Sequence, residues 1–409
     1  MSSIGWVDFS STDREKVSQV LAMLQEPGTL DELGIGQIRD AFADLLFPGF
    51  STIQTRAKYF ITVPRIIRDY FALDARIQRR TSLRDYLETQ ENELARLLVE
   101  RHGSAESGII GSEMVGSEQG VARKPSSVYW NGLRQFGIVN TAKSLAEFSR
   151  EVGQTQSVPR AAGHEEDDSD AISHRSVVHL DVFESDWMND VSIRLSESEA
   201  RFLIDKLTHT PAIRNSVISQ FLIHGLATEL VGDSSEALTF PELVAWAKGR
   251  AEVSQPCRNA LELAEEFSDA VRGAHIRFNI LIARNSGNTA LEAEREELFS
   301  QWLERARERN LFSASSVDDW LQAATSGGAR INVNARGFLR QWHESIFQNQ
   351  PVGSLDRLVE SRAQKNKGRR SVLLKNLGEV PNWQGVDSLS YRWPTARTIL
   401  TDIVQGAEC

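Results

Sequence analysis

The fold class is indicated most clearly by residues 35–64, IGQIRDAFADLLFPGFSTIQTRAKYFITVP. Apolar residues recur at helical spacing from Ile35 to Phe47, and Pro48-Gly49 ends that segment. Ser51 and Gln54 have the spacing of a capping box, which predicts a second helix over STIQTRAKYFITV. Pro64 is expected to kink or end that helix, because proline lacks the amide donor and clashes with the preceding turn.

Helical patterns continue on both sides of this stretch, whereas clear two-residue alternation is scarce. Further helices are predicted over residues 66–80, over Thr81 to His102, from Pro125 onward, from the capping box of Ser196 and Glu199, and over the closing segment that Pro394 introduces. Short strand candidates occur only near 177–182 and 331–333. The expected fold is mainly α, multi-helical and two-lobed, with a helix-turn-helix or winged-helix-like unit as an option for the N-terminal lobe.

Length and composition are those of an ordinary globular protein with about two or three domains. The chain has 409 residues, a formal net charge of -10, 41% hydrophobic residues and 2 Cys. We expect a helical N-terminal domain over 1–150 with a mobile loop at 103–124, an acidic linker over 151–190, and a helical C-terminal domain over 191–409. The first residues lack the features of a signal peptide and no apolar run is long enough to cross a bilayer, so a cytoplasmic protein without membrane contact is expected.

Catalytic motifs are missing from the sequence. It contains no phosphate-binding GxxxxGK[ST] loop, no GxGxxG, no HExxH, no GxSxG and no set of kinase motifs. His174 and His179 near Asp181 are one candidate metal site, but in an acidic linker the alternative is solvated surface histidines. We therefore expect no cofactor and no metal, and the sequence favours a protein without catalytic activity.

The strongest local charge signal is positive and lies between residues 56 and 84. Eight cations face only Asp69 and Asp74 there, in a chain that is acidic overall. Guanidinium groups in such a run bind phosphates bidentately when they are exposed. The alternative is a face that pairs with the acidic linker or with a partner protein. The candidate nucleic-acid contacts are Arg56, Lys58, Arg65, Arg68, Arg76, Arg79, Arg80 and Arg84.

A second basic run, SRAQKNKGRRSVLLK, lies near the C-terminus. Lysine and arginine runs bind nucleic acid only when the fold presents them together, and a solvated loop or helix end is the alternative. The candidate contacts are Arg362, Lys365, Lys367, Arg369 and Arg370.

A third candidate is the helix predicted from Pro125. It carries residue types that contact phosphates and base edges, as the recognition helix of a helix-turn-helix does. The alternative is a core helix, because its aromatic side chains lie beside Leu133 and Phe136. The candidate contacts are Arg123, Lys124, Tyr129, Asn131 and Arg134.

Four motifs give the chain a resemblance to an uncharacterised bacterial family of unknown function. They are IGWVDFS near the start, FPGFSTIQTRAKYF, YWNGLR, and YRWPTA near the end. Genes of this family resemble components of bacterial defence islands and lie near helicase and phospholipase-D-like genes. The resemblance implies a setting and carries no catalytic residues, and this chain lacks the HxK pattern of a phospholipase-D-like nuclease.

The leading hypothesis is a non-catalytic accessory subunit of a bacterial antiviral defence system that contacts nucleic acid through its basic runs. Its expected partners are DNA or RNA and helicase or phospholipase-D-like proteins of the same system. The first alternative is a protein-interaction scaffold that binds no nucleic acid and uses the Trp-rich C-terminal half as an interface. The second is an unrecognised metal-dependent nuclease with dispersed carboxylates. The leading hypothesis requires that the basic runs fold into one continuous surface.

Overall fold

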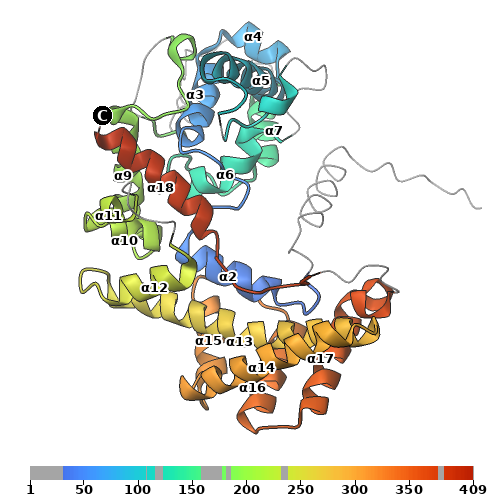
Figure 1. Ribbon diagram of the computed structural model, residues 1–409. Helices are drawn as coiled ribbons and strands as arrows, with labels where there is room; N and C mark the ends of the chain where they lie inside the picture. Colours follow the sequence, from blue (N-terminus) through green and yellow to red (C-terminus); the bar gives the residue numbers. More distant parts are fainter. Residues whose placement is uncertain are drawn as a thin grey trace, which may run out of the picture. The chain divides into compact units, whose positions relative to one another are not determined.

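The computed structural model describes residues 31–106, 108–115, 123–157, 177–180, 186–231, 238–375 and 382–408. These residues form sixteen α-helices and no β-strand, which confirms the predicted helical class (Figure 1). One isolated antiparallel bridge joins Val139 to Val178, so the strand candidate near 177–182 is reduced to a single pair. The other candidate, 331–333, precedes and begins a helix.

The chain divides into two compact units that each combine distant segments. Unit 1 comprises residues 1–42 and 260–389, and unit 2 comprises residues 43–259 and 390–409. This division differs from the predicted one at an acidic linker. Much of that linker, 158–176 and 181–185, lies outside the described residues, as do His174 and Asp181 of the candidate metal site. The acidic stretch marks a change of composition, whereas the units are set by burial between segments hundreds of residues apart.

Unit 2 contains most of the helices. The boundary between the units falls within α2 (Gly36–Leu46) and again within α13 (Gln255–Asn285). The helices that lie wholly in unit 2 are α3 (Tyr59–Ala72), α4 (Ala75–Arg80), α5 (Leu83–His102), α6 (Pro125–Gln135), α7 (Leu145–Ser157), α9 (Glu197–His209), α10 (Val217–Ile223), α11 (Ala227–Val231), α12 (Phe240–Lys248) and α18 (Trp393–Glu408).

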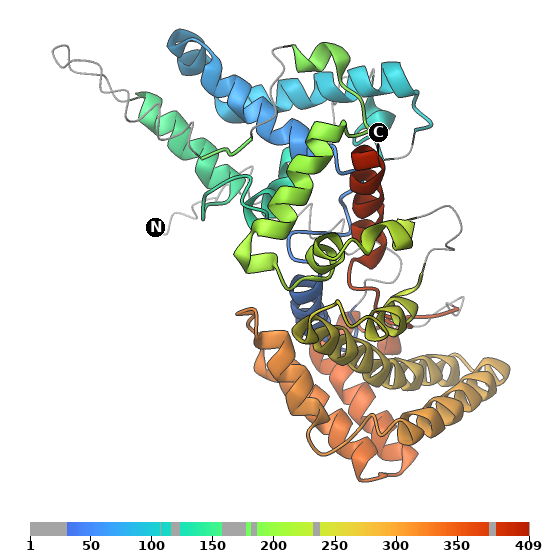
Figure 2. The ribbon, with the colours of Figure 1, turned by 90° about the vertical axis from the view of Figure 1, so that its left-hand side faces the viewer.

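The core of unit 2 is built on aromatic contacts between α3 and α6. The Phe60 ring lies 4.8 Å from the rings of both Tyr129 and Phe136, measured between centroids. The loop after α2 crosses α6 closely: a Cβ on Gly132 would lie 2.6 Å from the carbonyl oxygen of Gly49. Only glycine fits that crossing. Elsewhere in this unit, α18 packs along α9 (Figure 2).

Two helix boundaries differ from those predicted. The helix expected from Ser51 begins at Tyr59, because residues 51–58 bond instead to distant parts of unit 2, and Pro64 lies inside α3 rather than ending it. Residues 66–80 form the end of α3 and a separate α4, with Asp74 capping the second helix. The predicted helix over Thr81 to His102, the capping box at Ser196 and the closing helix are confirmed.

The loop predicted to be mobile is tied down where the structure describes it. The hydroxyl of Thr55 donates to the carbonyl of Gly108 over 2.7 Å, and the amide of Ile110 donates to the hydroxyl of Tyr59 over 2.8 Å. Residues 107 and 116–122 of this loop lie outside the described residues.

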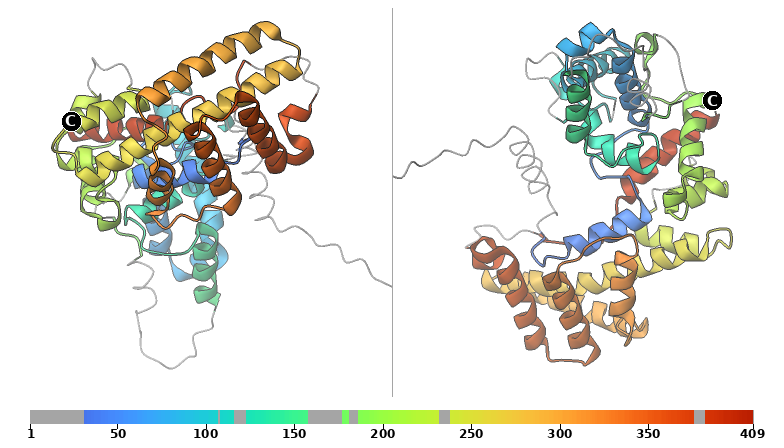
Figure 3. Two further views of the ribbon diagram at one scale, coloured as in Figure 1. Left: turned by 90° about the horizontal axis from the view of Figure 1, so that it is seen from below. Right: turned by 180° about the vertical axis from the view of Figure 1, so that it is seen from behind.

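Unit 1 is organised around the long helix α13. Its other helices are α14 (Thr289–Glu308), α15 (Ser316–Thr325), α16 (Val333–Phe347) and α17 (Val352–Lys367), followed by the short 3₁₀ turns η4 (Gly368–Arg370) and η5 (Val372–Leu374). Trp302, Trp320 and Trp342 are fully buried, so they belong to the core and not to the interface that the scaffold hypothesis expected. The indole of Trp342 donates to the carbonyl of Ala270 on α13 over 2.9 Å. Helices α16 and α17 lie side by side (Figure 3).

Candidate nucleic-acid interface

The first basic run begins inside unit 2 and is paired with carboxylates there. Arg56 donates from Nε to Asp402 on α18 over 3.0 Å and from Nη1 to Glu106 over 3.0 Å. Asp402 also accepts the amide of Ala57 over 2.8 Å. Arg56 therefore fastens the segment before α3 to the last helix of the chain.

Lys58 and Arg65 are buried and share one carboxylate. The Lys58 ammonium lies 2.6 Å from Glu199, and the Arg65 guanidinium lies 3.5 Å from the other oxygen of Glu199. The Arg65 guanidinium also stacks over the ring of Trp187 at 5.3 Å. Arg68 donates to the carbonyl of Leu180.

The structure thus corrects the prediction for these four side chains. They were expected to contact nucleic acid, but they bond to groups inside unit 2. Burying a charge is costly unless it is paired, and here the neutralising carboxylates come from α9 and α18, far along the chain. Arg56, Lys58, Arg65 and Arg68 hold unit 2 together.

Helix α6 is a core helix, which corrects its prediction as a recognition helix. Tyr129 is fully buried, and its hydroxyl accepts the amides of Thr55 and Arg56 over 2.8 and 3.1 Å. Burial raises the pKa of Tyr129 to about 12. Arg134 donates to the carbonyls of Thr141 and Ala142 and thereby closes the turn after the helix. The exposed residues of α6 form one stripe, Ser127, Asn131 and Gln135.

The two cations before α6 differ. Lys124 lies 3.1 Å from Glu88 on α5 and also reaches the amide oxygen of Asn92. Arg123 is exposed. Only Arg123 and Asn131 of the third candidate set are therefore both exposed and without an internal bond among the described residues.

Helix α4 presents the exposed part of the first run. Asp74 caps it by accepting the amide of Arg76 over 2.7 Å, and Gln78 anchors it by donating to the carbonyls of Tyr70 and Leu73. No residue of α4 is buried. Arg84, just beyond it on α5, is exposed as well. We call Arg76, Arg79 and Arg80 the α4 surface; within the described chain, none of the three forms an ion pair.

The second basic run surrounds the end of α17 in unit 1. Gly368 has a positive φ of 54°, which turns the chain out of α17 and into η4. We call Lys367, Arg369 and Arg370 the α17 basic end. None of them pairs with a carboxylate of the described residues, although the charge of Lys367 lowers the pKa of the buried Glu32, which burial raises.

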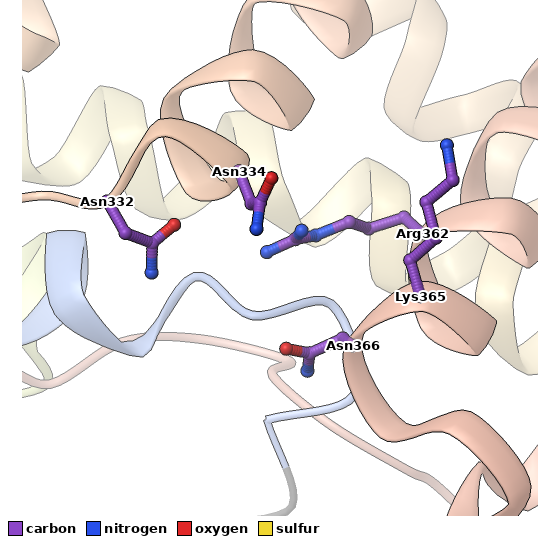
Figure 4. A pocket seen from close by; sticks show the side chains of 5 residues that line it. All are labelled: Asn332, Asn334, Arg362, Lys365 and Asn366. Atoms are coloured by element: carbon purple, nitrogen blue, oxygen red, sulfur yellow. The ribbon is translucent and has the colours of Figure 1, made fainter.

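Arg362 and Lys365 lie one and two turns earlier on α17 and line a pocket. Its volume is about 440 Å³, and its lining consists of Asn332, Asn334, Arg362, Lys365 and Asn366 (Figure 4). A smaller hollow of about 150 Å³ shares Asn334, Arg362 and Lys365 and continues along Phe338. No carboxylate lines either hollow.

Arg362 is buried, with 8% of its surface exposed, so it is not the surface contact that the sequence predicted. Its Nε donates to the carbonyl of Leu33 over 2.6 Å and its Nη2 to that of Gly34 over 3.1 Å. Gly34 has a φ of +64°, and a Cβ there would strike the guanidinium. The three asparagines of the pocket were missed, because they come from two helices about thirty residues apart and no spacing connects them.

Two further classes of site were sought among the described residues. No group of three or more His, Cys, Asp or Glu side chains is placed there to hold a metal ion. None of the helices that the structure describes combines the length and hydropathy that crossing a bilayer requires.

Comparison with known proteins gives one match. A family model described as a family of unknown function, DUF6361, matches residues 1–407. No curated protein matches the chain, and no solved structure matches it. The match spans nearly the whole chain, so the protein belongs to the DUF6361 family, whose function is unknown.

Proposed function

We propose that this protein is a non-catalytic accessory subunit that contacts nucleic acid through the α17 basic end, with the α4 surface as a second contact. The setting we propose is a bacterial antiviral defence system, as the resemblance to defence-island components implies. Helicase or phospholipase-D-like proteins of the same system are the proposed protein partners.

The observation that carries this proposal is the lack of carboxylate partners at the α17 basic end, within the part of the chain that the structure describes. The chain has a formal net charge of -10, and it pairs Arg56, Lys58 and Arg65 internally. Three neighbouring cations left without carboxylates keep a local positive field in an acidic protein. Phosphate binding depends on such a field, because each neutralised phosphate releases counterions.

The α4 surface supports the same function in unit 2. Arg76, Arg79 and Arg80 are all exposed on one short helix whose position is fixed by Gln78. Guanidinium groups bind phosphate oxygens bidentately, so a fixed helix of this kind suits backbone contacts that do not depend on sequence.

The test is a salt series with the full-length protein and fluorescent DNA and RNA oligonucleotides. The triple variant Lys367→Gln, Arg369→Gln, Arg370→Gln is expected to reduce the slope of log affinity against log salt by about 2 to 3. The matched control is Arg305→Gln, Arg307→Gln, Arg340→Gln, which removes the same charge from exposed positions of unit 1. Absence of binding at about 50 mM salt, or equal slopes for both variants, contradicts the proposal.

A protein partner is the second candidate function, favoured by exposed apolar side chains on unit 1. Phe347 and Val352, at the turn from α16 to α17, are 49% and 43% exposed. Co-purification of neighbouring gene products that survives nuclease treatment, and that Phe347→Ser abolishes, is the expected result for this function. Loss of the partner on nuclease treatment favours nucleic-acid contact instead.

A further inference from the structure

Two buried arginines of unit 1 differ in how their charge is balanced. Arg277 on α13 has no exposed surface and lies 2.5 Å from both Asp356 and Glu296. Arg362 on α17 is nearly as buried, but it bonds only to the carbonyls of Leu33 and Gly34. A buried charge without a counter-charge is expensive, so Arg362 is placed to receive an anion from outside.

The guanidinium of Arg362 is fixed and faces the pocket. Two of its nitrogens are held by backbone carbonyls, and its plane lies 5.6 Å from the ring of Phe338. Nη1 has no acceptor among the described residues. In Figure 4 the guanidinium points between the amides of Asn334 and Asn366, and the side chain of Lys365 rises beside it.

The other pocket groups also offer donors. Asn332 caps α16, because its Oδ1 accepts the amide of Ala335 over 2.7 Å, and this leaves its side-chain NH₂ free to donate. Asn334 lies in the first turn of α16, where the unpaired backbone amides and the helix dipole favour an anion.

The carboxylate nearest to Arg362 is turned onto backbone amides. Asp31 accepts the amides of Ile35 and Gly36 over 2.8 Å each. Its charge raises the pKa of Arg362, against the larger lowering that burial causes. Asp31 does not line the pocket, whose own lining carries two cations and no carboxylate.

We propose that this pocket binds a phosphate monoester, with Arg362 as the fixed charged donor, Lys365 as the second charge, and the amides of Asn332 and Asn334 as neutral donors. A phosphate dianion balances both cations, whereas a carboxylate balances one. The volume of about 440 Å³ is in the range of small-molecule sites. The monoester is either that of a free nucleotide or the terminal phosphate of a nucleic acid, and in the second form the inference rests on the proposed function.

The test measures binding to the full-length protein by calorimetry, with four probes. Adenosine monophosphate is compared with adenosine, and a 5′-phosphorylated oligonucleotide is compared with the same strand carrying a 5′-hydroxyl. We expect the phosphate to increase affinity at least tenfold in one of these pairs, and the pair identifies the source. Equal affinities within both pairs overturn the inference.

The variant Asn334→Asp places a negative charge in the pocket and preserves the fold, because an acid in the first turn of a helix is favourable. It is expected to lower phosphate affinity at least tenfold. The matched control Asn288→Asp makes the same change at the start of α14 in the same unit. Equal effects of the two variants overturn the site.

The two proposals fail separately. The variant Lys367→Gln, Arg369→Gln, Arg370→Gln leaves every pocket residue in place, so we expect it to weaken oligonucleotide binding and to retain the discrimination between phosphate and hydroxyl. Loss of that discrimination in the triple variant, with Asn334→Asp behaving as the wild type, assigns phosphate binding to the α17 basic end and overturns the pocket.

Discussion

The two basic runs of this chain look alike in sequence and have opposite environments. Arg56, Lys58 and Arg65 are bonded to Asp402, Glu106 and Glu199 inside unit 2. Lys367, Arg369 and Arg370 meet no carboxylate among the described residues of unit 1. The density of lysine and arginine along a sequence therefore does not reveal which cations remain available to a ligand. That depends on carboxylates that arrive from distant segments.

The largest expected effect comes from removing the carboxylate that Lys58 and Arg65 share. Glu199→Gln keeps a side chain that can complete the capping box of α9, but it leaves two buried cations without this counter-charge. We expect a loss of about 3 to 5 kcal/mol in the free energy of unfolding of unit 2, measured by denaturant titration.

The matched control for that variant is Glu93→Gln, which removes an exposed partner of Arg96 and is expected to cost at most about 1 kcal/mol. Similar losses for the two variants would break the contrast between buried and exposed cations.

The pH dependence of stability provides the next effect, since Glu91 is a buried carboxyl with no ion pair printed by the geometry of unit 2. It accepts the amide and the hydroxyl of Ser126, and burial raises its pKa from 4.5 to about 7. The folded state therefore binds this proton more tightly than the unfolded state. Its contribution is complete below pH 4.5 and is lost as the pH rises through 7. We expect a decline of about 3 kcal/mol over that interval.

Glu91→Gln should flatten this decline when unfolding is followed at several pH values. Lys124→Gln should steepen it, because the charge of Lys124 lowers the pKa of Glu91. A wild-type profile that is flat between these pH values would contradict the assignment.

The smallest effect separates structure from binding at α6. Arg134→Gln removes the two bonds that close the turn after the helix, and we expect a loss of about 1 kcal/mol in stability. Oligonucleotide affinity should not change, because the guanidinium is already engaged by carbonyls. A tenfold loss of affinity without a loss of stability would restore α6 as a contact helix.

Local signals predicted the parts of the fold that local bonds determine. Ser82, Ser196 and the closing helix begin or cap elements as their neighbours in sequence indicate. The start of α3 was missed, because Gln54 and the backbone of residues 51–58 bond to Gly49, Tyr129 and Asp402 in place of a helix. Those partners are set by tertiary packing and leave no pattern near Ser51.

The candidate site was predicted in part for the same reason. Arg362 and Lys365 were named from their place in a basic run, but one is buried and both line a pocket. The amides of Asn332 and Asn334 come from α16, and nothing in their spacing relates them to α17. Juxtaposition of two helices, and not composition, creates the site.

The most direct test of the account is lysine acetylation of the full-length protein with and without bound oligonucleotide, read by mass spectrometry. We predict that binding protects Lys365 and Lys367, that the buried Lys58 stays unreactive in both states, and that the exposed Lys143 reacts equally in both. Protection of Lys143 with unchanged reactivity at Lys365 and Lys367 would contradict the claim that the end of α17 meets the nucleic acid.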